Sequence, residues 1–172
     1  MWRRTIAYRL GQVRQQLGPV APLSTTERAE VARWLPGQAL ALFATMSLAD
    51  QRHSLRVCRA LQEQGCTEPD MLAAALLHDV GKAQGRVPFW TRPAIVLGKR
   101  LAHGLLSRLT VYPVDAHAHG WRRALSYAWH HAEVGADLAA AAGLSERAVL
   151  YIRTHHQPHG PAAQLHLVDE VS

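Results

Sequence analysis

Eleven histidines are spread over the 172-residue chain, and several stand next to carboxylates or next to each other. The pair His78-Asp79 is the clearest case, because it directly follows the apolar run 71–77. An imidazole and a carboxylate at the end of a buried run are costly to bury unless something satisfies them. A metal ion would satisfy both, since neutral His and ionised Asp are ordinary ligands of Zn, Mn, Fe and Ni. Taken alone, the pair is explained more simply as a capping His and a solvated Asp at a helix end.

The other candidate ligands share one property, which is a position at or beside the end of a predicted helix. The full set is His53, His78, Asp79, His131, His155, His156 and Asp169. Groups on separate helices could converge on one point inside a bundle, as metal ligands do in other helical folds. Each histidine by itself is better explained as a solvated or satisfied residue, so the prediction of a metal site depends on the combination. His130 is the alternative to its neighbour His131, and His117 and His119 are interpreted as surface residues of a loop.

The elements that must position these groups are predicted to be helices. Ala and Leu dominate the composition, while β-branched and aromatic residues are sparse. Ser24 and Glu27 have the spacing of a capping box, so a helix should begin near Thr25 and end before Pro36-Gly37. Further helices are predicted over 38–46, 48–65, 67–78, 121–127, 131–142, 145–156 and 162–168. The predicted fold is a single all-α bundle of about six to eight helices, with residues 1–46 as an arm with short helices and 47–172 as the metal-binding domain.

Segment 89–109 is apolar but carries Arg92, Lys99, Arg100, His103 and Arg108. It is interpreted as an amphipathic helix packed on the domain, with peripheral membrane contact as the alternative. The formal charge of +6 and the pI of about 10.0 are compatible with an anionic partner. We expect an anionic phosphorylated small molecule, a nucleotide by preference, and no specific nucleic-acid binding, because no long basic run is present.

The cellular setting predicted from the sequence is the cytoplasm. No apolar run reaches the roughly 18 residues that span a bilayer, and the basic N-terminus lacks the apolar core of a signal peptide. Two cysteines, Cys58 and Cys66, are too few for a disulfide framework. A homo-oligomer is compatible with everything above.

The order His53 … His78-Asp79 … Asp169 resembles the H…HD…D signature of the HD superfamily of metal-dependent phosphohydrolases. Four strings carry the resemblance. Residues 50–57 are similar to the family's first ligand helix, and 76–82 (LLHDVGK) to its most recognisable string. Residues 131–136 (HAEVGA) are similar to an "HPEIGA"-like segment, with Ala where Pro is common, and 152–156 (IRTHH) to the "I-x-x-HH" segment of subfamilies with two metals. The resemblance covers roughly 47–171 and leaves the first 46 residues without a motif. No Gly-Tyr-Pro segment follows the last pair of histidines, unlike in cyclic-di-GMP phosphodiesterases of the HD-GYP type.

The resemblance implies roles for the candidate residues. The first metal would be held by His53, His78, Asp79 and Asp169, with Asp79 bridging to a second metal held by His131 and His155. His156 would be a further ligand or a partner of one. Lys82 would contact a substrate phosphate or the attacking water, and Arg52 is a further candidate for phosphate contact. Asp169 stands only three residues before the end of the sequence, so this ligand needs a well-packed last helix.

The mixed His and carboxylate set suits one or two divalent ions of Fe, Mn, Co, Ni or Zn, with Fe or Mn favoured, better than Mg. The predicted function is hydrolysis of a nucleotide or another small phosphate ester or anhydride by a metal-activated water, with Asp79 and Lys82 as catalytic residues. Two alternatives remain open. Some relatives with the six-ligand pattern are di-iron oxygenases, and a domain of this kind could instead be a non-catalytic, metal-containing signalling or binding module.

Overall fold

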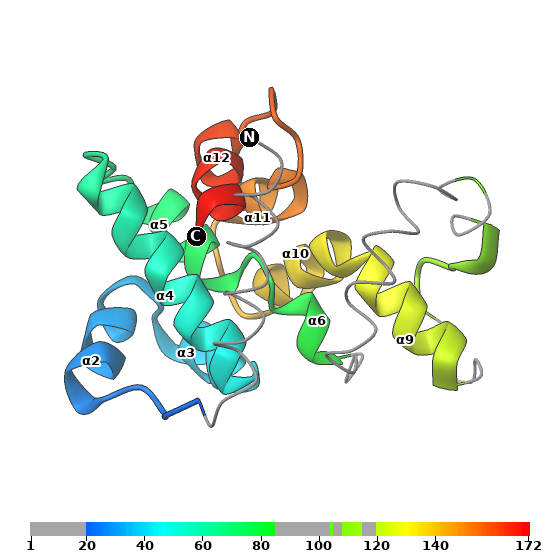
Figure 1. The fold of residues 1–172 in the computed structure, drawn as a ribbon, viewed down its shortest axis with the longest axis horizontal. Helices are drawn as coiled ribbons and strands as arrows, with labels where there is room; N and C mark the ends of the chain where they lie inside the picture. Colours follow the sequence, from blue (N-terminus) through cyan, green and yellow to red (C-terminus); the bar gives the residue numbers. More distant parts are fainter. Residues whose placement is uncertain (1–19, 85–103, 105–107, 115–119) are drawn as a thin grey trace, which may run out of the picture.

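The computed structural model describes residues 20–84, 104, 108–114 and 120–172, and these residues form helices joined by short loops, with no strand among them (Figure 1). The prediction of an all-α bundle is therefore confirmed. Residues 1–19, nearly all of segment 89–109, and both His117 and His119 lie outside the described residues. None of the helices in the described ranges has the length and hydrophobicity that a membrane span requires.

The N-terminal helices begin and end where local sequence signals predict. Helix α2 (Thr25–Trp34) carries the predicted capping box, in which Oγ of Ser24 accepts from the amide of Glu27 at 3.1 Å and Glu27 accepts from the amide of Ser24 at 2.7 Å. Pro36 separates α2 from α3 (Gly37–Ala44). Ser47 caps α4 (Leu48–Glu63), after which Gly65 adopts a left-handed φ of 86° that ends the helix.

Helix α5 (Pro69–Leu77) is the centre of the core. Every residue from Met71 to Leu77 is buried, so all faces of the helix after its first turn contact other elements. It packs against α4, α2 and α11 (Glu146–Thr154). The burial of this apolar surface stabilises the fold and fixes where the last residues of α5 lie.

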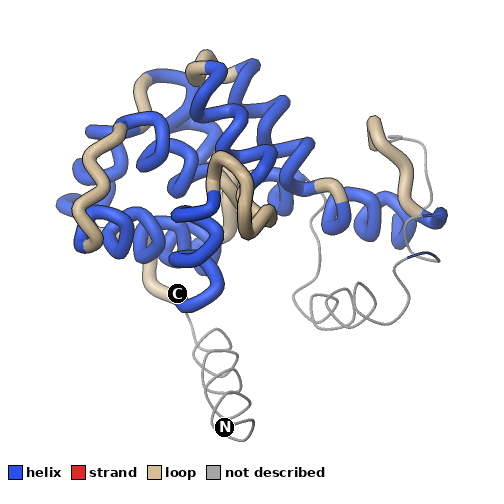
Figure 2. Tube along the Cα trace, turned by 90° about the horizontal axis from the view of Figure 1, so that it is seen from above, coloured by secondary structure: helices blue, strands red, loops and turns tan. Residues whose placement is uncertain are grey.

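The remaining helices complete the bundle around the end of α5. They are α6 (Gly81–Gln84), α9 (Gly120–Trp129), α10 (His131–Ala141) and α12 (Ala163–Val171). Helix α10 packs on α11 and α6, while α9 lies at the opposite end of the molecule from α2 in both views (Figures 1 and 2). Helix α12 packs on α4 and buries Leu165 and Val168 directly before Asp169. The last helix thus has the packing that a ligand at Asp169 requires.

Candidate metal centre

Histidines and aspartates from five parts of the chain meet at the end of α5. The ligand atoms of His53, His78 and Asp79 all lie within 4.8 Å of one another, and we call this group the first triad. The ligand atoms of His131, His155 and His156 meet the same limit and form the second triad. The two triads are neighbours, because the rings of His78 and His155 have their centroids 5.2 Å apart. The structure thus brings together residues that the sequence separates by more than a hundred positions.

Apart from His53, the ligands of the two triads come from a helix end or from the turn beside one. His53 lies in the second turn of α4, while His78 and Asp79 directly follow α5. His131 is the first residue of α10, and His155 and His156 directly follow α11. Helix ends leave backbone carbonyls without intrahelical donors, so ring nitrogens nearby find acceptors there.

Three of the histidines are oriented by such carbonyls. Nδ1 of His78 donates to the carbonyl of Ala75 at 2.8 Å, and Nδ1 of His131 donates to that of Ala128 at 2.9 Å. Nδ1 of His155 donates to the carbonyl of Ile152 at 2.7 Å. A carbonyl only accepts, so each Nδ1 carries the hydrogen, and a neutral ring then presents an unprotonated Nε2. Metal-binding histidines are commonly held in this way through their other nitrogen.

Two of the Nε2 atoms that face the centre lack a hydrogen-bond partner among the described residues. Nε2 of His78 and Nε2 of His155 are buried and make no hydrogen bond with any described residue. Buried polar atoms of this kind are rare and cost free energy unless a partner satisfies them. A metal ion accepts electron pairs from unprotonated imidazole nitrogens, so the residues present fit a metal centre.

Two aspartates supply the negative charge. Oδ1 of Asp169 accepts a hydrogen bond from Nε2 of His53 at 2.8 Å and lies 3.4 Å from Nε2 of His78, so Asp169 belongs with the first triad. Asp79 contacts both triads: its Oδ2 lies 3.7 Å from Nε2 of His78, and its Oδ1 lies 3.7 Å from Nε2 of His131. Asp79 therefore lies between the two triads.

The second triad contains a short contact between ring nitrogens. Nε2 of His156 and Nε2 of His131 are 2.8 Å apart. Since the hydrogen of neutral His131 is on Nδ1, His156 is the donor in this contact. A metal ion between these rings would replace that shared hydrogen.

The pKa values follow from burial and from the neighbouring charges. Burial lowers the pKa of His131 well below its usual value and lowers the pKa of His155 to about 3, so both rings are neutral, as ligation requires. Burial also disfavours a charged His78, but the charges of Asp79 and Asp169 outweigh it and raise the pKa to about 9. The two carboxylates thus favour a positive charge at His78, which is a proton in the metal-free protein.

Both carboxyl groups are held in the ionised form. Burial by itself would raise the pKa of Asp79, but Lys82 and the surrounding histidines hold it well below its usual value. The hydrogen bond from His53 and the nearby positive charge of His78 likewise outweigh burial and lower the pKa of Asp169. Ionised carboxylates are the form that binds a metal.

Lys82 lies beside Asp79. Its Nζ is 2.5 Å from Oδ1 of Asp79, the oxygen that faces His131. The Lys82 side chain is 26% exposed, whereas that of Asp79 is 6% exposed. The lysine thus extends from the buried carboxylate toward solvent.

Two glycines allow the close approach of α6 and α10. A Cβ atom on Gly81 would lie only 2.1 Å from the carbonyl oxygen of His131 and 2.9 Å from the amide nitrogen of Gly135. A Cβ on Gly135 would meet its nearest neighbours at 3.4 Å. The missing side chain at position 81 therefore lets the segment that carries Asp79 and Lys82 contact the helix that begins with His131.

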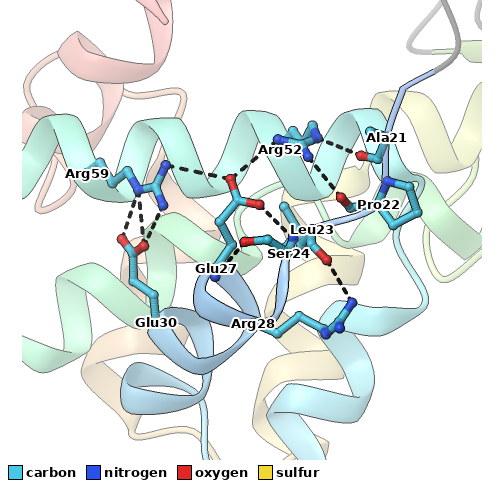
Figure 3. Close-up of polar contacts among 9 residues, drawn as sticks. All are labelled: Ala21, Pro22, Leu23, Ser24, Glu27, Arg28, Glu30, Arg52 and Arg59. Carbon is cyan, nitrogen blue, oxygen red and sulfur yellow. Dashed lines mark hydrogen bonds and ion pairs between the residues drawn. The ribbon is translucent and has the colours of Figure 1, made fainter.

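Arg52 faces a different part of the molecule (Figure 3). Its guanidinium donates to the carbonyls of Ala21 at 2.6 Å and Pro22 at 2.9 Å, and Nη1 lies 3.4 Å from Glu27. About two helical turns further along α4, Arg59 pairs with Glu30 at 2.6 Å. These contacts attach α2 and the residues before it to α4, and a phosphate contact of Arg52 stays a prediction.

One residue beside the centre, His166, was not predicted. Nδ1 of His166 donates to the carbonyl of His155 at 3.1 Å and so connects α12 to the end of α11. Its place three residues before Asp169 on one helix was the available signal. His130, the alternative to His131, has its ring 5.5 Å from that of Tyr112 and lies 4.0 Å from Glu133, outside both triads.

No family model, no curated protein and no solved structure matches the chain in comparisons with known proteins.

Proposed function

We propose that this chain is a metal-dependent phosphohydrolase of the HD type that acts on a nucleotide or another small phosphate ester or anhydride. One observation carries the proposal: Asp79 of the first triad also lies 3.7 Å from His131 of the second triad, and the ammonium of Lys82 lies at that same carboxylate. The order of these residues in the chain, which resembles the HD signature, supports it as well.

The residues divide into two ligand sets. The first triad with Asp169 would hold one divalent transition metal, and the second triad with Asp79 would hold another. Bound divalent ions lower the pKa of a water ligand and neutralise charge on a phosphoryl group. The mixture of imidazole and carboxylate favours Fe, Mn, Co, Ni or Zn as the metal, and Fe or Mn is our first choice.

The protein's own contribution is to keep each group in the required charge state. Burial keeps His131 and His155 neutral, and the surrounding cations keep Asp79 ionised. Lys82 is the cation near the centre with a partly exposed, flexible stem, so its ammonium can contact a phosphate oxygen that enters from solvent. The net charge of +6 would draw an anionic substrate toward the protein, an effect that salt should weaken.

The test begins with metal content, measured by mass spectrometry on the full chain purified without added metal. We expect near-stoichiometric transition metal in the wild type and in His159→Ala, which removes an exposed histidine outside both triads. The double variant His78→Ala/Asp79→Ala should lose the metal. Circular dichroism would show that the helices persist in each variant.

Activity is then measured on a panel of nucleotides and phosphate esters with the metal-loaded protein. Release of inorganic phosphate by the wild type and His159→Ala, but not by the double variant, is the expected result. A wild type that binds no metal even after reconstitution would refute the proposal. Oxygen uptake by iron-loaded protein without phosphate release would favour an oxygenase, and metal binding without turnover of any kind would favour a non-catalytic domain.

A further inference from the structure

Lys82 and the second triad both lie close to the same oxygen atom of Asp79. Nζ of Lys82 lies 2.5 Å from Oδ1 of Asp79. Nε2 of His131, a member of the second triad, lies 3.7 Å from the same oxygen. The other oxygen of Asp79 faces His78 of the first triad. An ammonium and a metal ion on the side of His131 would therefore both draw on the charge of Oδ1.

The two triads differ in the charge that they offer a cation. The first triad includes the carboxylate of Asp79 and has a second carboxylate beside it, that of Asp169. The second consists of three histidines, and its rings are neutral when they act as ligands. A dication there thus depends on Asp79 for its counter-charge, whereas a dication in the first triad also has Asp169.

The ammonium of Lys82 reduces what Asp79 can offer. It neutralises the carboxylate at contact distance, and it would repel a dication held nearby in a largely buried environment. Its flexible four-carbon stem and partial exposure allow it to leave Asp79 when another anion becomes available. A phosphate group is such an anion, because its oxygens carry charge and accept from ammonium groups.

We propose that Lys82 is a built-in competitor for the second metal: its ammonium holds Oδ1 of Asp79 and weakens metal binding at the second triad until a phosphate draws it away. The inference rests on the proposed function, because it takes the two triads to be metal sites. It makes complete loading of the centre depend on the arrival of substrate.

The experiment is a titration of the metal-free full chain with Mn²⁺ by calorimetry and with Co²⁺ by visible absorption. Lys82→Met removes the charge and keeps most of the length of the side chain, and Lys82→Arg keeps the charge. Arg56→Met is the matched control, since it removes an exposed positive charge from α4 outside both triads. Thermal unfolding of all four metal-free proteins would show that each is folded.

In the wild type we expect a second class of sites that binds at least about tenfold more weakly than the first, or that stays empty over the titration. In Lys82→Met the second class should tighten by about tenfold or more, while Lys82→Arg and Arg56→Met should behave like the wild type. Inorganic phosphate should tighten the second class more in the wild type than in Lys82→Met, because only the wild type has an ammonium to displace.

Equal binding of the second metal by the wild type and Lys82→Met would overturn the inference while leaving the proposed function intact. One metal in both proteins would also overturn it. A wild type that binds no metal would refute the proposed function and the inference together. A single metal in the wild type and two in Lys82→Met would support it most directly.

Discussion

The substitution Gly81→Ala tests whether the close approach of α6 and α10 assembles the centre. The added methyl carbon would lie 2.1 Å from the carbonyl oxygen of His131 and 2.9 Å from the amide nitrogen of Gly135. Both are backbone atoms, so no side-chain rotation relieves the contact. Reaching 3.0 Å, below which real Cβ contacts are essentially never found, requires a relative movement of about 0.9 Å between the two elements.

The movement has two measurable consequences. Overpacking of this kind costs about 1–3 kcal/mol, which lowers the Tm of a domain of this size by roughly 2–12 °C. The separation of 3.7 Å between Oδ1 of Asp79 and Nε2 of His131 should also widen by about the same 0.9 Å. The second triad would then lose the nearby carboxylate of Asp79, while the first triad, built from α4 and the residues directly after α5, keeps its geometry.

Thermal unfolding of the metal-free protein and metal stoichiometry of the loaded protein measure these effects separately. We expect Gly81→Ala to unfold earlier and, with inorganic phosphate present so that the second site of the wild type fills, to bind about one metal fewer than the wild type. Gly120→Ala is the matched control, because an added Cβ there meets nothing within 4 Å, and Gly135→Ala should fall in between, with contacts of 3.4 Å. If Gly81→Ala unfolds and binds metal as Gly120→Ala does, the glycine contact does not position the centre.

Three further predictions concern Asp169, His78 and Arg52. Asp169→Asn removes a charge from the first triad and should weaken its metal by about tenfold or more in a chelator competition, and unchanged affinity would exclude Asp169 as a ligand. The metal-free protein should lose stability as pH rises from 6.5 to about 9, because the folded state keeps a proton on His78 that the unfolded chain has released. His78→Gln should lack this loss when the free energy of unfolding in urea is measured across the same pH range. The same pH profile in the wild type and in His78→Gln would refute the assigned pKa. Arg52→Ala removes the contacts to residues 21, 22 and 27, so limited proteolysis near residue 21 should accelerate while metal content stays constant; an unchanged cleavage rate would show that these contacts do not hold the segment.

Much of the fold was predictable because helix ends are encoded within a few residues. The capping box of Ser24 and Glu27, the cap at Ser47 and the left-handed Gly65 each act over at most one turn, and α2 and α4 begin at Thr25 and Leu48, where the sequence predicts them. The apolar run 71–77 likewise became the buried centre of the core.

The candidate ligands were also recognisable in the sequence, as residue types at the ends of predicted helices. Their arrangement into two triads was not recognisable, because it depends on how α4, α10, α11 and α12 pack in the bundle. Packing decides that His131 joins the second triad while its neighbour His130 contacts Tyr112. It also directs Arg52 to the carbonyls before α2, although its neighbour His53 enters the first triad.

The sequence alone therefore determined which groups were available, since charge, donor type and local helix signals belong to single residues and their near neighbours. Only the tertiary structure decided which oxygen of Asp79 faces which triad, that Lys82 shares one of them, and that Gly81 permits the approach. These features are distances of a few ångströms between segments far apart in the chain. They are fixed by close packing of the core, which no local pattern specifies.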